Sequence, residues 1–344
     1  MLRPDSGAGF LQDLAYTDFQ VGSQRLVSDR FIEVFGAARE PDGELKDHHR
    51  DVARALQHQT EEVVLDLARS LHARTGLPRL VMAGGVALNC VSNGRLLREG
   101  PFDEIFVQPA AGDNGACLGA ALHVAHRKLG QQRGSPQRHA FLGPAFTDAE
   151  VRDAAAARGL TAEEPDDVIE RTAELLSDGG IVGWMQGRME FGPRALGGRS
   201  ILADPRCAET KERLNASVKF REAFRPFAPS VALEAASDWF DDARPSPFML
   251  TTFHVKRSQQ ERIPGVVHVD GSARVQTVSA DENPKFHALL HAFGQRTGVP
   301  LLLNTSFNIR GEPIVSTPGE ALEALIRTGL SAVVLGATIF HAPS

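Results

Sequence analysis

The sequence predicts an α/β fold, and three observations support that prediction. Strand, glycine turn and helix follow one another twice between residues 80 and 129, an order typical of α/β domains that bind phosphate or nucleotide at helix N-termini. A second alternation of helices and strands occupies residues 146–344. The chain has 344 residues, of which 42% are hydrophobic and 23% charged, so it is long enough for two domains with sizeable cores.

The first domain is expected over residues 1–130 and begins with an irregular stretch, 1–45, that holds one pair of strands. Apolar residues at helical spacing then predict a long amphipathic helix from His49 to Arg74. The elements expected after it are a buried strand at 80–83, a Gly84-Gly85 turn into a helix at 86–97, a strand at 104–108, and a turn at 112–115 into a helix that ends at 129.

A Gly/Gln/Arg/Pro-rich stretch at 131–145 has no periodicity and is predicted to be the linker. The second domain is then expected over residues 146–344. Its expected elements are helices at 168–176, 210–217, 284–297 and 319–328, and strands at 181–185, 299–304 and 332–340.

Composition narrows the class of protein. An isoelectric point near 6.1 argues against a partner nucleic acid held by phosphate contacts. The three cysteines show no CxxC spacing and form no disulfide framework. No apolar run is long enough to span a membrane, and the start of the chain has no signal-peptide pattern. We therefore expect a soluble, cytoplasmic protein.

Residues 188–205 read RMEFGPRALGGRSILADP and form the densest polar loop in the chain. Arg188, Glu190, Arg194 and Arg199 lie among glycines that permit close backbone approach to a ligand. Residues 186–225 hold nine Lys/Arg against five Asp/Glu in a chain of net charge −6. Arginine forks bind phosphate or carboxylate oxygens, so the loop predicts a pocket for a small anion. The alternative is a solvated arginine loop.

The two glycine turns are candidate ligand sites. Backbone amides at Gly84, Gly85 and Asn89 suit a phosphate or ribose at the start of a helix. Asp113, in the second turn, stands at the carboxyl end of a strand, where metal-ligating or substrate-positioning carboxylates occur. The alternative for Asp113 is a turn or N-cap aspartate.

Two further segments carry polar side chains at every second position. In VKFR an extended strand would direct Lys219 and Arg221 to one side, and NTSFN would do the same for Asn304, Ser306 and Asn308. Cations that converge with hydroxyl and amide groups suit a triphosphate and an acyl phosphate. The alternative is two exposed strand ends with no common target.

Two other polar groups are weaker candidates. The segment HVDGSARVQ holds a cluster that could face the same pocket, namely His268, Asp270, Arg274 and Gln276. His287 and His291 have the i, i+4 spacing of helical metal ligands, but no Glu lies between them, so we expect them to be exposed or at the edge of the core. No GxSxG elbow indicates a serine nucleophile.

Five segments, in this order, resemble the motifs of O-carbamoyltransferases of the NodU/CmcH type: AGGVALNCVSNGRLL, QPAAGDNGACLGAAL, GRMEFGPRALGGRSILADPR, VKFREAFRPFAPS and LLLNTSFNIRGEPIV. The resemblance covers essentially the whole chain. It implies a partial actin/sugar-kinase-like lobe at 1–130 and a YrdC-like α/β domain with a twisted mixed sheet at 146–344.

The resemblance also implies an activity. The YrdC-like domain would make carbamoyl-adenylate from carbamoyl phosphate and ATP with Mg²⁺, and the carbamoyl group would pass to a hydroxyl of a small molecule, such as an antibiotic or a sugar. The KxR and SxN signatures of YrdC-like domains fall on Lys219/Arg221 and Ser306/Asn308. The implied catalytic residues are Arg194, Arg199, Lys219 and Arg221. The implied binding residues are Gly84, Gly85, Asn89, Arg188, Glu190, Arg274, Asn304, Ser306 and Asn308.

The chain departs from the family pattern at the metal site. In the family, an early HxxxH pair and a later aspartate, matched by Asp113, bind an iron-type divalent metal. We expect this chain to lack the pair and the first lobe, so that Fe²⁺ binds only if a separate polypeptide supplies the histidines. An apolar face on residues 45–130 would then meet that partner. The alternatives are a catalytically incomplete binding subunit and an enzyme of tRNA threonylcarbamoylation.

Overall fold

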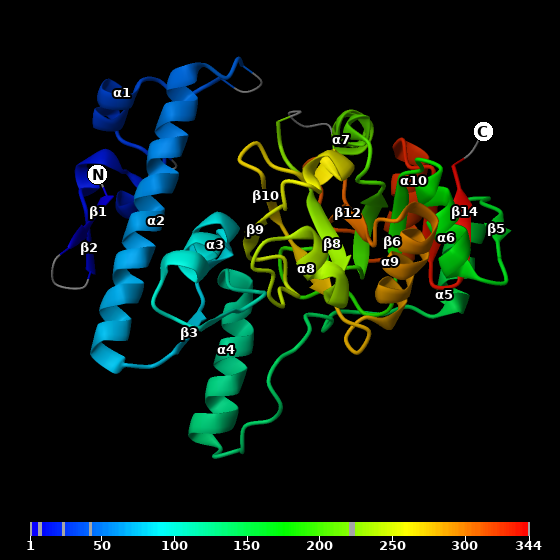
Figure 1. The fold of residues 1–344 in the computed structure, drawn as a ribbon, viewed down its shortest axis with the longest axis horizontal. Helices are drawn as coiled ribbons and strands as arrows, with labels where there is room; N and C mark the ends of the chain where they lie inside the picture. Colours follow the sequence, from blue (N-terminus) through cyan, green and yellow to red (C-terminus); the bar gives the residue numbers. More distant parts are fainter. Residues whose placement is uncertain (1, 6–8, 23–24, 41–42, 220–223, 343–344) are drawn as a thin grey trace. The chain divides into compact units, whose positions relative to one another are not determined.

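The computed structural model describes residues 2–5, 9–22, 25–40, 43–219 and 224–342. The chain forms two compact units, coloured along the sequence in Figure 1. Unit 1 comprises Met1–Met82 and Val91–Phe106, and unit 2 comprises Ala83–Cys90 and Val107–Ser344. The division into domains at 1–130 and 146–344 stays a prediction.

Unit 1 is built on the long helix that the apolar spacing predicts. This helix, α2, runs over Asp47–Thr75 and ends at Gly76, whose φ of +63° suits a glycine C-cap. The predicted strand pair is confirmed as an antiparallel pair, whereas the sequence pattern does not predict helix α1. The elements of unit 1 are β1 (Leu2–Asp5), β2 (Gly9–Gln12), η1 (Leu14–Tyr16), η2 (Phe19–Val21), α1 (Asp29–Phe35), α2, β3 (Arg79–Met82), α3 (Cys90–Glu99) and β4 (Glu104–Val107), the last two sharing one end residue with unit 2.

The core of unit 1 lies between α2 and α3. Leu65 and Ala68 of α2 pack with Leu96 and Phe102, all at most 5% exposed. Arg95 of α3 forms ion pairs with Glu61 and Glu62 of α2 and with Glu99 of its own helix. The middle of the apolar stripe of α2 is thus buried, whereas Leu56 and Leu71 of the same stripe are exposed.

Unit 2 contains an eight-stranded mixed sheet, which confirms the predicted α/β class. Its order is β11-β8-β12-β7-β6-β13-β14-β5. The β11/β8 and β13/β6 pairs are parallel and the others are antiparallel. The strands of unit 2 are β5 (Ala162–Glu163), β6 (Val182–Met185), β7 (Arg199–Ala203), β8 (Ala228–Ala232), β9 (Thr252–His254), β10 (Ser272–Arg274), β11 (Gln276–Val278), β12 (Leu301–Ser306), β13 (Ala332–Leu335) and β14 (Thr338–His341).

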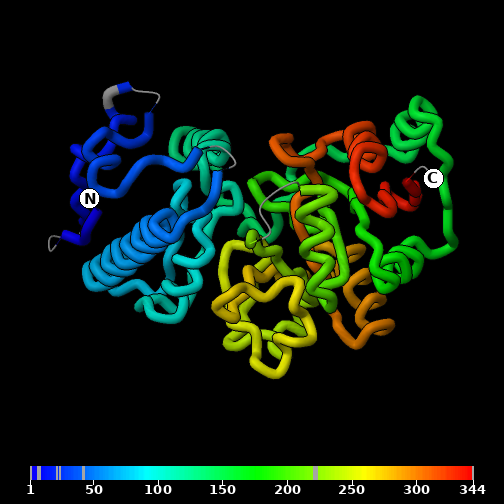
Figure 2. The backbone as a smooth tube through the Cα atoms, turned by 90° about the horizontal axis from the view of Figure 1, so that it is seen from above, coloured from blue at the N-terminus to red at the C-terminus, as the bar shows by residue number. Residues whose placement is uncertain are grey.

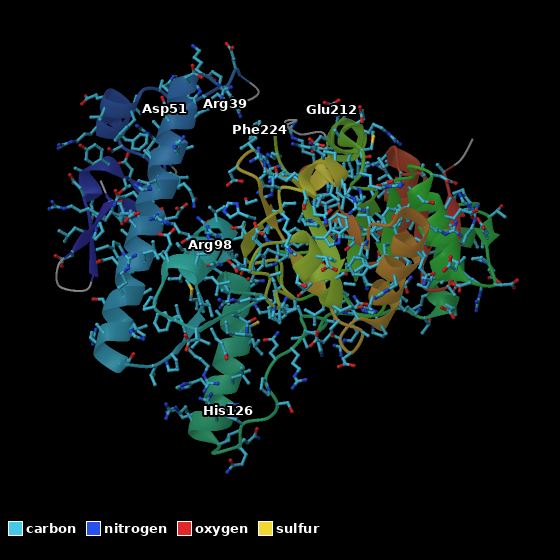
Figure 3. All side chains as sticks on the ribbon, viewed as in Figure 1. Arg39, Asp51, Arg98, His126, Glu212 and Phe224 are labelled. Atoms are coloured by element: carbon cyan, nitrogen blue, oxygen red, sulfur yellow. The ribbon has the colours of Figure 1, made fainter. Side chains whose placement is uncertain are left out.

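Helices cover this sheet, and segments far apart in the sequence lie side by side. Figure 2 shows the red end of the chain beside the green segment near residue 150, where α10 packs against α5. Helices α6 and α9 also pack together, and side chains crowd the space around the sheet (Figure 3). The helices of unit 2 are η3 (Gly85–Leu88), η4 (Asp113–Gly115), α4 (Ala116–His123), η5 (Val124–Lys128), α5 (Asp148–Ala156), α6 (Val168–Ser177), α7 (Ala208–Leu214), η6 (Asn215–Lys219), η7 (Leu233–Ala235), α8 (Ala236–Trp239), η8 (Gln260–Arg262), η9 (Pro264–Val266), α9 (Pro284–Thr297) and α10 (Pro318–Arg327).

Three predicted elements differ from the structure. The strand expected at 332–340 is the hairpin β13–β14, because Gly336, at φ +65°, begins a turn between them. The helix expected at 86–97 divides into η3 and α3, separated by Asn89 at ψ 90°. The strand expected across VKFR is wrong at Lys219, where the helical turn η6 continues from α7 without a breaking residue; Phe220 and Arg221 lie outside the described residues.

Strands β7 and β8 were missed by the sequence pattern. The sequence predicts a loop throughout residues 188–205, whereas Arg199–Ala203 form β7. Pro229 lies within β8, between β11 and β12 in the sheet. A proline usually argues against an inner strand because it cannot donate a ladder hydrogen bond. Within the part of the chain that the structure describes, no helix has the length and apolar character needed to cross a bilayer.

Candidate functional site

Glu190 organises the arginine loop, which we define as residues 188–199. Its side chain is 6% exposed, and its Oε1 accepts hydrogen bonds from three backbone amides. The donors are the amides of Leu196 at 2.6 Å, Gly198 at 2.7 Å and Arg199 at 3.2 Å. Hydrogen bonds to an ionised carboxylate are stronger than those between neutral groups. The loop is therefore folded around an internal anion.

The guanidinium group of Arg199 also holds this loop in place, by donating to the backbone in and beside it. It is fully buried, and its Nη1 and Nη2 donate to backbone carbonyls. Burial lowers the pKa of the guanidinium, and the nearby Glu190 partly offsets this effect. The four carbonyl acceptors belong to Gln186, Gly187, Gly198 and Pro144. Its terminal nitrogens thus bind the backbone, and the predicted contact of Arg199 with phosphate stays a prediction.

A buried polar network supports the loop from the sheet. Asn304 Nδ2 donates to the carbonyl of Ala195 at 3.2 Å, and Gln276 Nε2 donates to that of Leu196 at 2.8 Å. Asn304 is fully buried, and its Oδ1 is without a partner among the described residues. Ser230 Oγ lies 2.6 Å from Gln276 Oε1 and 2.9 Å from Asn304 Nδ2. The structure therefore places Asn304 beneath the loop.

The other two arginines of the loop have different surroundings. Arg188 is exposed, and its Nε and Nη2 donate to the carbonyls of Gly143 at 2.8 Å and Leu142 at 2.6 Å. Arg194 is half-buried, and its Nη2 lies 3.5 Å from the carbonyl of Leu88 in the first glycine turn. Burial lowers the pKa of Arg194, and its Nε has no partner in the described part of the chain. Arg194 is thus the loop arginine that reaches the glycine turn.

Both glycine turns adjoin the arginine loop. The amide of Gly84, at φ +99°, donates to the carbonyl of Ala111 at 2.7 Å, which joins the two turns. Gly192 has φ +145°, and a Cβ there would lie 2.7 Å from the carbonyl oxygen of Pro109. Only glycine accommodates this conformation and approach. No heavy atom lies within 4 Å of a Cβ placed on Gly85, so a ligand atom would have room beside this residue.

Asn89 and Asp113 occupy these turns. Asn89 follows η3 and its amide donates to the carbonyl of Val86 at 3.0 Å. Asp113 is exposed and begins η4. Among the described residues, Asp113 belongs to no group of three close His, Cys, Asp or Glu ligands. One carboxylate is too few to hold a transition metal, which usually takes three or four protein ligands.

Lys219 lies in a cage of oxygens from the other motif. Its side chain is 5% exposed, and Nζ donates to Asn308 Oδ1 at 2.7 Å and to Ser306 Oγ at 3.2 Å. It also donates to the carbonyls of Ser306 at 2.5 Å and Asn308 at 3.1 Å. Ser306 Oγ donates in turn to Asn308 Oδ1 at 2.6 Å. The structure therefore brings Lys219, Ser306 and Asn308 together, although Lys219 does not lie on a strand.

This lysine cluster and the arginine loop are linked through two paired strands. Ser306 of β12 is opposite Ser200 of β7, and the amide of Phe307 donates to the carbonyl of Arg199 at 3.0 Å. Arg199 and Lys219 are thus held at the same end of the β7–β12 pair. Arg221 lies outside the described residues, so its place relative to Lys219 is not described.

The segment HVDGSARVQ divides between two surroundings. Asp270 accepts from Ser272 Oγ at 2.7 Å. Burial raises the pKa of Asp270, but hydrogen bonds from Ser272 together with the nearby His268 lower it below its usual value. Burial lowers the pKa of His268. Arg274 ends β10 and is half-buried. Within this segment, Gln276 is the residue whose hydrogen bond to the arginine loop is described above.

The sequence pattern missed two residues that support the loop. Trp184 Nε1 donates to the carbonyl of Gly197 at 3.0 Å, and Ser230 completes the network of Asn304 and Gln276. Both are fully buried in strands of the sheet. A polar atom within an otherwise apolar strand is the signal that could have found them, because buried polar groups need partners.

Two protein-family models match the chain. The model described as carbamoyltransferase N-terminus matches residues 6–122, and the one described as carbamoyltransferase C-terminus matches residues 173–342. The matched ranges include both glycine turns, the arginine loop and the lysine cluster.

Curated proteins from several bacteria are similar over most of the chain. Nodulation protein NolNO of Sinorhizobium fredii is 47% identical over 295 residues, which are 84% of this chain and 43% of that protein. Nodulation protein NolO of Bradyrhizobium diazoefficiens is 45% identical over 297 residues, 84% of this chain and 54% of that protein. The uncharacterised protein sll1178 of Synechocystis is 42% identical over 355 residues, 95% of this chain and 58% of that protein. The chain spans about half the length of these relatives.

Proposed function

Because the chain belongs to the carbamoyltransferase family, we propose that it makes carbamoyl-adenylate from carbamoyl phosphate and ATP. The carbamoyl group would then pass to a hydroxyl of a small molecule, such as a natural product or a sugar. In the first step, water releases phosphate from carbamoyl phosphate, and an oxygen of the resulting carbamate attacks the α-phosphorus of ATP as pyrophosphate leaves. In the second, the acceptor oxygen bonds to the carbamoyl carbon, its proton is lost and AMP leaves.

The lysine cluster is the observation that carries this proposal. A buried ammonium beside Ser306 and Asn308, at the end of the strand pair that also holds the arginine loop, concentrates cationic charge and hydrogen-bond donors in one place. Preorganised donors of this kind stabilise charge on transferring phosphoryl groups. Lys219 already donates to oxygens of Ser306 and Asn308, so it would bind a phosphate oxygen by exchanging one of these contacts. Mg²⁺ would accompany the triphosphate.

The arginines would have different roles. Arg194 is the better candidate for a direct contact with an anion, because it reaches the glycine turns and its Nε has no partner among the described residues. Arg199, whose terminal nitrogens bind carbonyls, would act by holding the loop in shape. Glu190 would do the same through the amides, and Asn304 through the carbonyl of Ala195.

The transfer step requires more than the described residues provide. Asp113 alone does not fit a transition-metal site, so we derive no step from a bound metal. Large apolar side chains are exposed on residues 45–130 in each unit, and we propose that a lobe bearing histidines binds to some of them and completes the site. These side chains include Leu56, Leu71, Leu77, Val81, Val86, Leu122 and Leu129.

Pyrophosphate release tests the first step. The chain should release pyrophosphate only when ATP and carbamoyl phosphate are both present, and it should not carbamoylate an acceptor until the histidine-bearing lobe is added. Release of pyrophosphate with ATP alone would contradict this order of events.

A catalytically silent binding subunit is the second candidate, and the solitary Asp113 favours it. Calorimetric titration with ATP and carbamoyl phosphate, combined with the pyrophosphate assay, separates the two. A silent subunit would bind the nucleotide yet form no pyrophosphate, even with the partner lobe present.

The free thiols Cys90, Cys117 and Cys207 and the use of ATP fit a cytoplasmic reaction.

A further inference from the structure

Glu234, His287 and His291 bring three ligand-type side chains together in unit 2, away from the residues assigned above. His287 Nε2 lies 2.9 Å from Glu234 Oε1, and His291 Nε2 lies 2.5 Å from the same oxygen. One ligand atom from each residue lies within 4.8 Å of the other two. In the described part of the chain, no other group of three or more His, Cys, Asp or Glu residues is close enough to share an ion.

The positions of these residues follow from the fold. His287 and His291 are one helical turn apart on α9, and their rings have centroids 4.5 Å apart. Glu234 lies in η7, the turn that directly follows β8. Their side chains are 17%, 44% and 54% exposed for His287, His291 and Glu234, respectively. The histidines thus lie at the edge of the core, as the sequence predicts. The facing carboxylate of Glu234 lies 53 positions before His287 in the sequence, so the helix pattern alone does not reveal it.

The supporting helix is rigid enough to hold the pair. Four apolar residues of α9 are fully buried and fasten it to the sheet and to α6: Phe286, Leu289, Leu290 and Phe293. Two histidines at i, i+4 on a fixed helix present both imidazoles to one side. Rigid support of this kind is what a metal site requires.

We propose that Glu234, His287 and His291 bind one divalent transition-metal ion of the zinc class. Imidazole suits zinc and its neighbours in the first transition series, and two histidines with one carboxylate make a recurring three-ligand set with an open position. Zinc–nitrogen and zinc–oxygen bonds are about 2.0–2.2 Å long, and ligand atoms within 4.8 Å of one another are close enough to share one ion. Metal binding would replace the shared hydrogen bonds to Oε1.

Such an ion would fasten α9 to the turn after β8. The neighbouring Phe286 packs against the arginine loop, where a Cβ at Gly197 would lie 2.3 Å from its ring. The ion would therefore stabilise the helix that supports the loop without contacting the reactants. This role is independent of the proposed carbamoyl transfer.

Titration of the metal-free chain with Zn²⁺ and with Co²⁺ tests the site. We expect one ion per chain, a rise in the melting temperature with added Zn²⁺, and a visible Co²⁺ absorption band typical of nitrogen and oxygen ligands. His291→Ala and Glu234→Gln, both at exposed side chains, should weaken binding by at least about tenfold, since even outer-shell changes cost about 10–100-fold.

Two control variants make the result specific. His341→Ala removes a histidine that pairs with Glu163 and that belongs to no cluster of three ligand-type side chains among the described residues. Asp113→Ala removes the aspartate that matches the family's metal ligand. Both variants should leave Zn²⁺ binding unchanged. Circular dichroism of the metal-free variants checks their folding. Absence of Zn²⁺ binding to the wild-type chain, or equal binding by His291→Ala and Glu234→Gln, would overturn the proposal.

Discussion

The ammonium nitrogen of Lys219 lies 2.7 Å from Oδ1 of Asn308, a residue 89 positions further along the chain. The same oxygen accepts from Ser306 Oγ, while Asn308 Nδ2 donates to the carbonyl of Glu312 at 2.8 Å. The asparagine side chain is thus oriented by groups on both sides. This contact joins the end of η6 to the segment after β12, and it places a buried cation where the family motifs meet.

Replacing Lys219 should remove the first half-reaction. Lys219→Gln keeps a polar side chain but loses the charge that would neutralise phosphate, so we expect pyrophosphate release to fall at least about a hundredfold. Lys211→Gln, two helical turns earlier in α7, is the matched control and should retain activity. The Lys219→Ala, Arg221→Ala double variant should be at least as impaired, and unaltered turnover in it would refute the assignment.

Glu190→Gln should lower the free energy of unfolding of the protein and also slow its release of pyrophosphate. The neutral amide would still accept hydrogen bonds from the three amides, but the charge-assisted part would be lost, at a cost of about 1–2 kcal/mol. Urea unfolding measures this change. Glu174→Gln, at an exposed carboxylate paired with Arg171, should change the free energy of unfolding by less than about 0.5 kcal/mol. Equal effects of the two variants would show that Glu190 does not organise the loop.

Gly192→Ala should strain the arginine loop. Its φ of +145° and the carbonyl oxygen of Pro109, 2.7 Å from an added Cβ, together predict a loss of about 1–3 kcal/mol in the free energy of unfolding. Gly119→Ala is the control, because this helical glycine has open space around it and should gain about 0.5–1 kcal/mol. A neutral Gly192→Ala variant would mean that the loop does not need this conformation.

Glu163 should make stability depend on pH. Hydrogen bonds from Arg171 and then from His341 lower the pKa of Glu163 below its usual 4.5. The folded state therefore binds the proton less tightly than the unfolded state. The stabilisation is present above pH 4.5 and is lost as the pH falls through the lowered pKa. Unfolding free energies of wild type and Glu163→Gln should differ near neutral pH and converge in acid. A difference that does not change with pH would contradict this.

Periodic elements with end signals were predictable from the sequence. The helix at 284–297 is observed with the predicted ends because Asn283 caps it, Pro284 occupies its first turn and Gly298 ends it at φ +72°. Strand β8 was not predictable in this way, since Pro229 argues against an inner strand. Its neighbours in the sheet tolerate the proline, and that information is absent from the local pattern.

The sequence by itself determined the α/β class, the long helices, the two glycine turns and the order of the family motifs, because these depend on local spacing and on residue types. Only the tertiary structure decided which side chains meet. It directs the terminal nitrogens of Arg199 to backbone carbonyls, places Asn304 beneath Ala195, and sets Glu234 against His287 and His291. These contacts join residues up to 109 positions apart. They depend on the strand order β8-β12-β7 and on the packing of α9, which local periodicity does not specify.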